Sequence, residues 1–441
     1  MKAKSSSVDY SHVLFVTLVV ALSSACTTPG PTKEMSLEKA KQITVSMSDR
    51  TAFVPPPRRI DDITAILNQP GEFNRKLTEK FVARANATPP ATDNKIALYR
   101  FFKMRGRAAH ELGNPVQALE DLRTAFRLAE EAGTKDKELA LWLSLPERDT
   151  GNLKRALELL ESQLPAPGLP GLYGNLVETY CGVGRVEDAI KIRDQALSHF
   201  RWSQDPWWEI SLTLMEFKIL SSQGKAAQAE PFLRKHIQLY ERAARERFPA
   251  GVIGRHQWLA GNLLNQQRLI EAEVEARKAL SESIAHAGKD SIMTAWCLDL
   301  IAGILLGQGR LQEAEQLCSI AVDMLNRLEI PGTFPVTRSV RRTLANIRFA
   351  KGDFFSAMNL YEQVRESLGD QRLYENMVTS NPDLVLALIM TGRPQEALEI
   401  ADAVYRRSME IYGDKAGWTK GWQTIRGMAH FRLKNLKEAL K

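Results

Sequence analysis

Four basic side chains lie on one face of a predicted helix near residue 100, at a spacing that suits binding of an anion. Arg100, Lys103, Arg107 and His110 are separated by three, four and three positions, which places them in one stripe. A guanidinium group presents paired N–H donors that match a carboxylate. The stripe therefore predicts a site for an acidic peptide or protein, and a charged face that only meets water is the alternative.

The chain offers little else that could do chemistry. It lacks the phosphate-binding loop, the G-x-S-x-G turn and the H-E-x-x-H helix, and His110-Glu111 is followed by Leu-Gly-Asn, which breaks the metal-binding spacing. Cys181, Cys297 and Cys318 form no C-x-x-C pair and occupy helical positions that suit small apolar residues. We expect unpaired thiols, with redox chemistry or disulfides as the alternative, and a non-catalytic protein without metal or cofactor.

The chain is only mildly basic, with a formal net charge of +7. Its 59 Lys and Arg residues exceed its 52 Asp and Glu residues by seven, and the excess is not concentrated in one tail or segment. Nucleic-acid-binding proteins usually gather such an excess on one face. We therefore expect no nucleic acid among the partners.

The first 25 residues have the three parts of a secretory signal peptide. Lys2 and Lys4 precede the apolar run 13–22, which is too short to span a bilayer, and small residues follow at 23–25. Ser24-Ala25-Cys26 resembles the lipobox of bacterial lipoproteins, which implies lipidation of Cys26 and an outer-membrane lipoprotein that faces the periplasm. Ordinary cleavage and secretion, or an uncleaved anchor, are the alternatives.

Residues 26–98 predict a tether, a proline-rich spacer and short helices. Residues 27–33 are rich in Thr, Pro and Gly, and a short helix is predicted over 36–48. Pro55–Pro57 must be extended. Asp61 and Asp62 are expected to cap a helix that runs to Leu67, rather than to form a paired-carboxylate site, and a further helix is expected from about 72 to 85.

From residue 99 to 441 the chain repeats a helical hairpin nine times. The unit is clearest at 295–325, where an apolar helical stripe is broken by Gly309 and then resumes. A small residue opens each second helix, at Ala118, Ala156, Ala189, Ala229, Ala272, Ala314, Ala357, Ala397 and Ala439. Five positions upstream the residue is glycine in seven cases, and Gln267 and Lys434 are the exceptions. The second repeat, which has Pro146 in its first helix, and the fourth are degenerate, and the ninth is incomplete.

The small residues Ala302, Ala314 and Ala321, at spacings of 12 and 7, resemble the tetratricopeptide repeat, or TPR. This resemblance implies an all-α, right-handed superhelical α-solenoid. Repeat spacings near 42 resemble those of kinesin light chains and bacterial multi-repeat scaffolds, and imply a deep groove for extended peptides or whole domains.

The same resemblance implies that first helices line the concave face. It assigns the stripe from Arg100 to His110 to the groove, together with Arg342 and Asn346. The latter pair is similar to residues that clamp a peptide carboxylate in some TPR proteins. However, Pro382 and Asp383 occupy the positions where further donors would be needed, so a full clamp is not expected.

Residues 53–67, FVPPPRRIDDITAIL, resemble the stretch before the repeats in exported TPR proteins with a C-terminal caspase-like CHAT domain. Because no polar capping helix follows the ninth repeat, we expect the chain to be a fragment of a longer protein, with a frayed last half-hairpin as the alternative. The favoured function is a protein-binding scaffold of the cell envelope. The alternatives are the substrate-recruiting region of a CHAT-type peptidase, with its catalytic domain beyond residue 441, and an envelope assembly factor.

Overall fold

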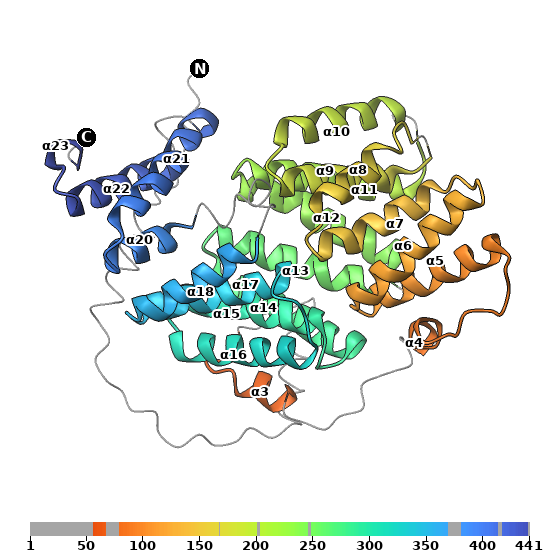
Figure 1. Ribbon diagram of the computed structural model, residues 1–441, viewed down its shortest axis with the longest axis horizontal. Helices are drawn as coiled ribbons and strands as arrows, with labels where there is room; N and C mark the ends of the chain where they lie inside the picture. Colours follow the sequence, from red (N-terminus) through yellow and green to blue (C-terminus); the bar gives the residue numbers. More distant parts are fainter. Residues whose placement is uncertain are drawn as a thin grey trace. The chain divides into compact units, whose positions relative to one another are not determined.

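A computed structural model describes residues 56–67, 79–166, 168–200, 203–245, 248–368, 381–412 and 417–439. Within these ranges every regular element is an α-helix, which confirms the predicted all-α class (Figure 1). The signal peptide, Cys26 and the helix predicted over 36–48 lie outside the described residues. The helices fall into two compact units: a larger one with Lys33–Gln308 and Gln316–Val340, and a smaller one with Gly309–Glu315 and Arg341–Lys441.

Within the described residues, the helices from Lys95 onward can be grouped into nine successive hairpins. They are α5 (Lys95–Glu111) with α6 (Pro115–Glu131), α7 (Lys137–Asp149) with α8 (Leu153–Glu161), α9 (Pro170–Gly182) with α10 (Val186–Phe200), α11 (Pro206–Ser222) with α12 (Ala226–Ala244), α13 (Pro249–Asn265) with α14 (Leu269–Ala287), α15 (Ile292–Gly307) with α16 (Leu311–Arg327), α17 (Pro335–Ala350) with α18 (Phe354–Glu366), α20 (Pro382–Met390) with α21 (Pro394–Tyr412), and α22 (Gly417–Arg432) with α23 (Leu436–Ala439). Pro146 lies inside α7, as expected for the degenerate second repeat.

The turns inside the hairpins confirm the predicted register. All seven turn glycines have positive φ, a region that glycine enters without steric penalty. The two exceptions adopt the same conformation, with φ of 60° at Gln267 and 63° at Lys434. The turn geometry is therefore kept in all nine hairpins, even where the residue is not glycine.

The small residues lie where the two helices of a hairpin approach closely. The alanines that open the second helices of the first eight hairpins are all fully buried, from Ala118 to Ala397. In the first hairpin, a Cβ added at Gly106 would lie 2.8 Å from Cγ of Leu122. A larger side chain at such a site overpacks the contact and costs about 1–3 kcal/mol.

Among the described residues, two short helices precede the hairpins and belong to the larger unit. Helix α4 (Glu79–Ala85) buries Phe81 and Ala85 against Ala108 of α5. Helix α3 (Asp61–Leu67) buries Ile63 and Leu67.

Asp62 does not act as a surface helix cap, contrary to the prediction from the sequence. Its side chain is only 2% exposed and forms an ion pair with Arg277 of α14, which is 3% exposed. Arg277 also donates to Oε1 of Glu273 at 2.9 Å. Pairing with a residue 215 positions away holds α3 against the fifth hairpin.

Within the larger unit the first hairpin contacts the fifth. The backbone N–H of Ala250, in the first turn of α13, donates to Oε2 of Glu111 at the end of α5 (3.2 Å). His286 of α14 donates from Nε2 to the carbonyl oxygen of Glu111 (2.6 Å). Gly113 fits against Met293, because a Cβ there would lie 2.9 Å from the Met293 side chain. The two hydrogen bonds join the first hairpin to the fifth, and the Met293 contact joins it to the sixth.

The smaller unit has a core of its own. Trp422 of α22 is 1% exposed and packs in a cluster with Ile425, Leu388 of α20, and Tyr361 of α18. This cluster supplies the apolar burial that joins the last three hairpins.

Candidate ligand-binding cavity

A cavity of about 530 Å³ lies within the larger unit. Its lining comes mainly from the first helices of six consecutive hairpins, α5, α7, α9, α11, α13 and α15, with two residues from α12. Ligand cavities commonly have about 300–1,000 Å³. The space thus suits a small molecule or a few residues of a peptide, and it is too small for the whole domains that the repeat length suggested.

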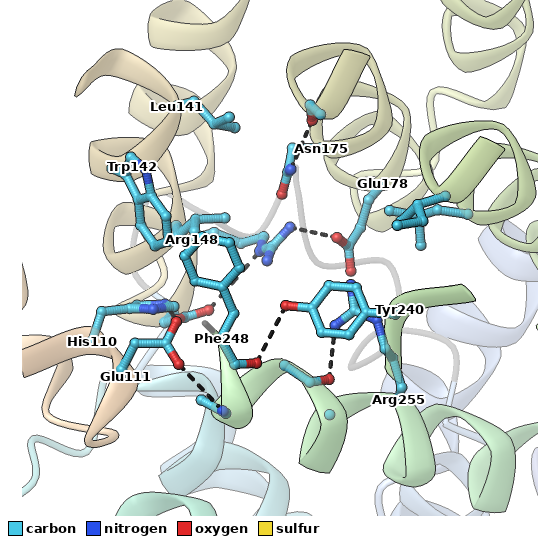
Figure 2. A pocket seen from close by; sticks show the side chains of 18 of the residues that line it. His110, Glu111, Leu141, Trp142, Arg148, Asn175, Glu178, Tyr240, Phe248 and Arg255 are labelled. Carbon is cyan, nitrogen blue, oxygen red and sulfur yellow. Dashed lines mark hydrogen bonds and ion pairs between the residues drawn. The ribbon is translucent and has the colours of Figure 1, made fainter. Parts of the chain in front are cut away.

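Aromatic side chains form much of the cavity wall (Figure 2). The ring centroid of Phe248 lies 5.4 Å from that of Trp142 and 5.9 Å from that of Trp207. Trp258 and Trp296 add to the lining. Such a wall favours ligands with a flat or branched apolar part.

An ion-pair cluster lies on one side of this wall. Glu178 of α9 accepts from Arg148 and from Lys218, each at 2.8 Å, so both of its oxygens are occupied. Although burial acts to raise the pKa of Glu178, the two cations outweigh it and lower the pKa to about 2. Glu178 is therefore ionised at neutral pH, and its charge is already neutralised by the protein.

Arg255 of α13 differs from Arg148 in its partners, which are an aromatic ring, a histidine and a backbone carbonyl group. It lies with its guanidinium carbon 3.3 Å from the centroid of the Tyr240 ring, and it donates from Nε to His236 (2.9 Å) and from Nη1 to the carbonyl oxygen of Gly251 (2.7 Å). Among the residues that the structure describes, Arg255 forms no ion pair with a carboxylate. A cation that lines a cavity and has no carboxylate in direct contact is a candidate anion-binding group.

His236 is a neutral acceptor for Arg255. Its imidazole is fully buried and donates from Nδ1 to the carbonyl oxygen of Ile210 (2.9 Å), which leaves Nε2 as the acceptor. Burial and the charge of Arg255 hold the pKa of His236 well below its usual value. The histidine thus positions the arginine without adding charge to the cavity.

Glu111 also lines the cavity, at the contact between the first and fifth hairpins. Burial raises the pKa of its carboxyl group to about 7. Close to neutral pH a good part of this group is protonated, so it only partly balances the positive charge nearby.

The structure places the predicted basic stripe of α5 against α7. Lys103 lies 2.8 Å from Asp136 and from Glu138, and Arg107 packs on the Trp142 ring at 4.2 Å. His110 lies 3.1 Å from Asp149 and lines the cavity, whereas Arg100 is exposed. Much of the charge of the stripe is therefore balanced inside the protein, and a direct role of these residues in binding stays a prediction.

Arg342 and Asn346 lie on α17, in the smaller unit. The Asn346 side chain accepts from the hydroxyl of Tyr361 (2.6 Å) and from Asn381 (3.2 Å). The amide thus joins α17, α18 and the start of α20. Whether the pair also binds a peptide stays a prediction.

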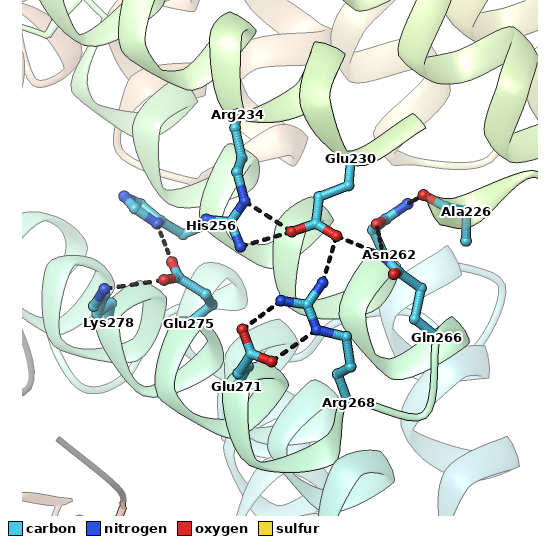
Figure 3. A network of polar contacts seen from close by, with 10 residues as sticks. All are labelled: Ala226, Glu230, Arg234, His256, Asn262, Gln266, Arg268, Glu271, Glu275 and Lys278. Atoms are coloured by element: carbon cyan, nitrogen blue, oxygen red, sulfur yellow. Dashed lines mark hydrogen bonds and ion pairs between the residues drawn. The ribbon is translucent and has the colours of Figure 1, made fainter. Parts of the chain in front are cut away.

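A polar network joins α12, α13 and α14 (Figure 3). Glu230 of α12 accepts from Arg234, Gln266 and Arg268 at 2.6–2.8 Å. Elsewhere on the same helices, Nδ1 of His256 in α13 lies 2.9 Å from Oε2 of Glu275 in α14. This network fixes α13, the helix that carries Arg255.

The described residues offer few groups for other chemistry. No three His, Cys, Asp or Glu side chains of the described residues are grouped to hold a metal ion. Cys181, Cys297 and Cys318 form no disulfide with one another, and burial raises the pKa of Cys297 to about 12. None of the described helices combines the length and apolar character that a membrane span requires.

Sequence reasoning did not identify Arg255, Arg148 or Glu178 as cavity residues. A signal for two members of the cluster was nevertheless present. Glu178 is the only charged residue of α9, and Lys218 is one of only three in α11, which is otherwise mostly apolar. Isolated charges in helices that are apolar on most sides indicate buried, paired groups.

No family model matches the chain, and no curated protein matches it. Solved structures do match. The nearly identical TPR-like repeats of a kinesin light chain-like protein from Podosopora anserina share 16% identity over 47% of this chain and 99% of that chain, with a TM-score of 0.35. BtubC from P. vanneervenii shares 19% identity over 52% and 91%, with a TM-score of 0.36. A Rap protein in complex with Competence and Sporulation Factor shares 14% identity over 75% and 99%, with a TM-score of 0.39.

Proposed function

We propose that this chain is a non-catalytic binding protein that takes a short segment of a peptide or protein partner into the cavity of its larger unit. The observation that carries the proposal is the cavity itself, lined by the first helices of six consecutive hairpins. A mainly apolar hollow that also carries polar groups is the usual form of a binding site. A chain built from repeated hairpins is also suited to presenting such a surface.

Filling the cavity tests this proposal. A Cβ added at Gly254, a helical residue of the cavity lining, would meet no atom within 4 Å, so Gly254→Leu should fold normally and occupy the space. Gly261 lies on the same helix, also has open space and does not line the cavity, so Gly261→Leu is the matched control. We expect peptides selected from a random library on the wild-type protein to bind Gly261→Leu and to lose binding to Gly254→Leu. Equal binding to both variants would place the site elsewhere.

We further propose, from the N-terminal pattern alone, that the protein is exported and anchored through Cys26 at the outer membrane. Radiolabelled palmitate should enter the wild-type protein in a bacterial host and be absent from Cys26→Ala. Processing without label would favour plain secretion. The roles of peptidase-recruiting region and assembly factor are alternatives that the sequence raised, and the mass of the native gene product would test the first.

A further inference from the structure

The guanidinium of Arg255 keeps donors available to the cavity. Of its five N–H donors, one is directed to His236 and one to the carbonyl oxygen of Gly251. No other acceptor for Arg255 is found among the described residues. The group lines the cavity and is partly exposed to it.

The acidic groups nearest to Arg255 are already engaged. Both oxygens of Glu178 are occupied by Arg148 and Lys218. Glu111 accepts from the backbone of Ala250 and is partly protonated near neutral pH. The positive charge of Arg255 is thus left for a group that comes from outside.

The orientation of Arg255 is fixed by its neighbours. Tyr240 lies beneath the guanidinium, and Gly251 leaves the space that both side chains need, because a Cβ there would lie 2.2 Å from the Tyr240 oxygen. A guanidinium that lies flat on a ring presents its edge, the fork that matches the two oxygens of a carboxylate. The group is therefore held ready before a ligand arrives.

Asn175 is a further polar residue of the cavity lining, contributed by a different helix from Arg255. Asn175 of α9 donates from Nδ2 to the carbonyl oxygen of Gly171 (2.8 Å), so its Oδ1 is the atom that remains to accept a hydrogen bond (Figure 2). The aromatic rings of Trp142, Tyr240 and Phe248 belong to the same lining (Figure 2). The cavity therefore combines a candidate anion site, apolar surface and an amide acceptor.

We infer that the cavity binds a carboxylate attached to a short aromatic or branched apolar body that carries one N–H group, with Arg255 holding the carboxylate. This chemistry is found in an N-acylated apolar amino acid and in the last residue of a peptide. The inference rests on the proposed function, since it names the group that enters the cavity. Arg255 would be the residue that selects acids over neutral analogues.

Calorimetric titration tests the inference with N-acetyl-L-phenylalanine, its uncharged amide and the tripeptide Gly-Gly-Phe. We expect the acid to bind the wild-type protein and the amide to bind at least about tenfold more weakly, because charge-assisted hydrogen bonds contribute about 1.5–3 kcal/mol. Arg255→Gln, which can still bond His236, should weaken the acid about 10–100-fold and leave the amide unchanged. Arg245→Gln, which removes a positive charge from an exposed pair with Glu282, should have no effect.

The outcomes separate the two proposals. If acid and amide bind alike, or if Arg255→Gln changes nothing while Gly254→Leu abolishes binding, the carboxylate assignment is wrong and the cavity remains the site. If acid binding survives Gly254→Leu, the cavity is not the site and the proposed function fails as well. Absence of binding by both the acid and the tripeptide overturns the assignment.

Comparison of the acid with the tripeptide identifies the source of the carboxylate. Tighter binding of Gly-Gly-Phe indicates a peptide end, and tighter binding of N-acetyl-L-phenylalanine indicates a small acid. Should Arg255→Gln fold poorly, Arg255→Lys provides a second variant. It keeps the charge but loses the fork, so weaker binding of the acid with unchanged binding of the amide is expected.

Discussion

The backbone N–H of Ala250 donates a hydrogen bond to the carboxyl group of Glu111, 139 residues earlier in the chain. This contact joins the end of α5 to the first turn of α13, at the edge of the cavity. Because Glu111 is only 4% exposed, its protonation is linked to how firmly the two hairpins are held together.

The first prediction concerns the pH dependence of this contact. The pKa of Glu111 is raised from 4.5 to about 7 in the folded protein, so the folded state binds more protons than the unfolded state between these values. The free energy of unfolding should therefore decrease as pH rises from about 5 to 7. Glu111→Gln keeps an acceptor for Ala250 and should remove this part of the slope in urea unfolding. A slope identical in both proteins would contradict the assignment.

A second prediction concerns His256, whose pKa is raised by carboxylate partners rather than by burial. Although burial acts to lower the pKa of His256, hydrogen bonds to Glu241 and Glu275 outweigh it and raise the pKa to about 9. The stabilisation is complete below the unfolded value of 6.5 and is lost as pH rises through about 9. His256→Gln should thus lower the thermal midpoint clearly at pH 6 and little at pH 10. A constant difference across this range would show that the imidazolium is not involved.

A third prediction tests the space beside Arg255. A Cβ at Gly251 would lie 2.7 Å from Cζ of Tyr240 and 2.8 Å from Nη1 of Arg255, so Gly251→Ala must displace these side chains. We expect a loss of about 1–3 kcal/mol in the free energy of unfolding, together with weaker binding of N-acetyl-L-phenylalanine. Gly254→Ala, where the new methyl group has open space, should be neutral or slightly stabilising. Equal effects of the two alanines would disprove the close contact.

A fourth prediction concerns the N-terminal helix α3. Asp62→Ala would leave the buried Arg277 with Glu273 as its remaining ion-pair partner. Removing one member of a buried ion pair typically costs about 3–5 kcal/mol. Proteolysis at residues 56–67 should therefore become faster. Asp61→Ala, at a partly exposed pair with Arg59, serves as the control and should leave the rate unchanged.

The features that the sequence predicted well are those set by residues close to one another in the chain. The positions of the hairpin turns follow from glycines and apolar stripes a few residues apart, and the structure has positive φ at each of them, including Gln267 and Lys434. The buried alanines follow from the same local pattern, since a close helix crossing requires a small residue at a fixed position.

The features that the sequence did not predict depend on residues far apart in the chain. Helical periodicity gives the face on which Asp62 or Glu111 lies, but it contains no information on which distant helix will face it. The partners of the basic stripe could not be predicted from the sequence for the same reason. The spacing of Lys103 and Arg107 correctly describes one face of α5, but not that acidic and aromatic side chains of α7 lie against it.

The contact of the first hairpin with the fifth changes how the larger unit should unfold. In an open repeat array each repeat touches only its neighbours, so the ends fray and stability is nearly a sum of local terms. Here the loss of either end breaks contacts at the other, through Glu111, Ala250 and His286. The five hairpins should therefore melt together as one cooperative block, and their folding should be slowed by the need to close a loop of more than a hundred residues.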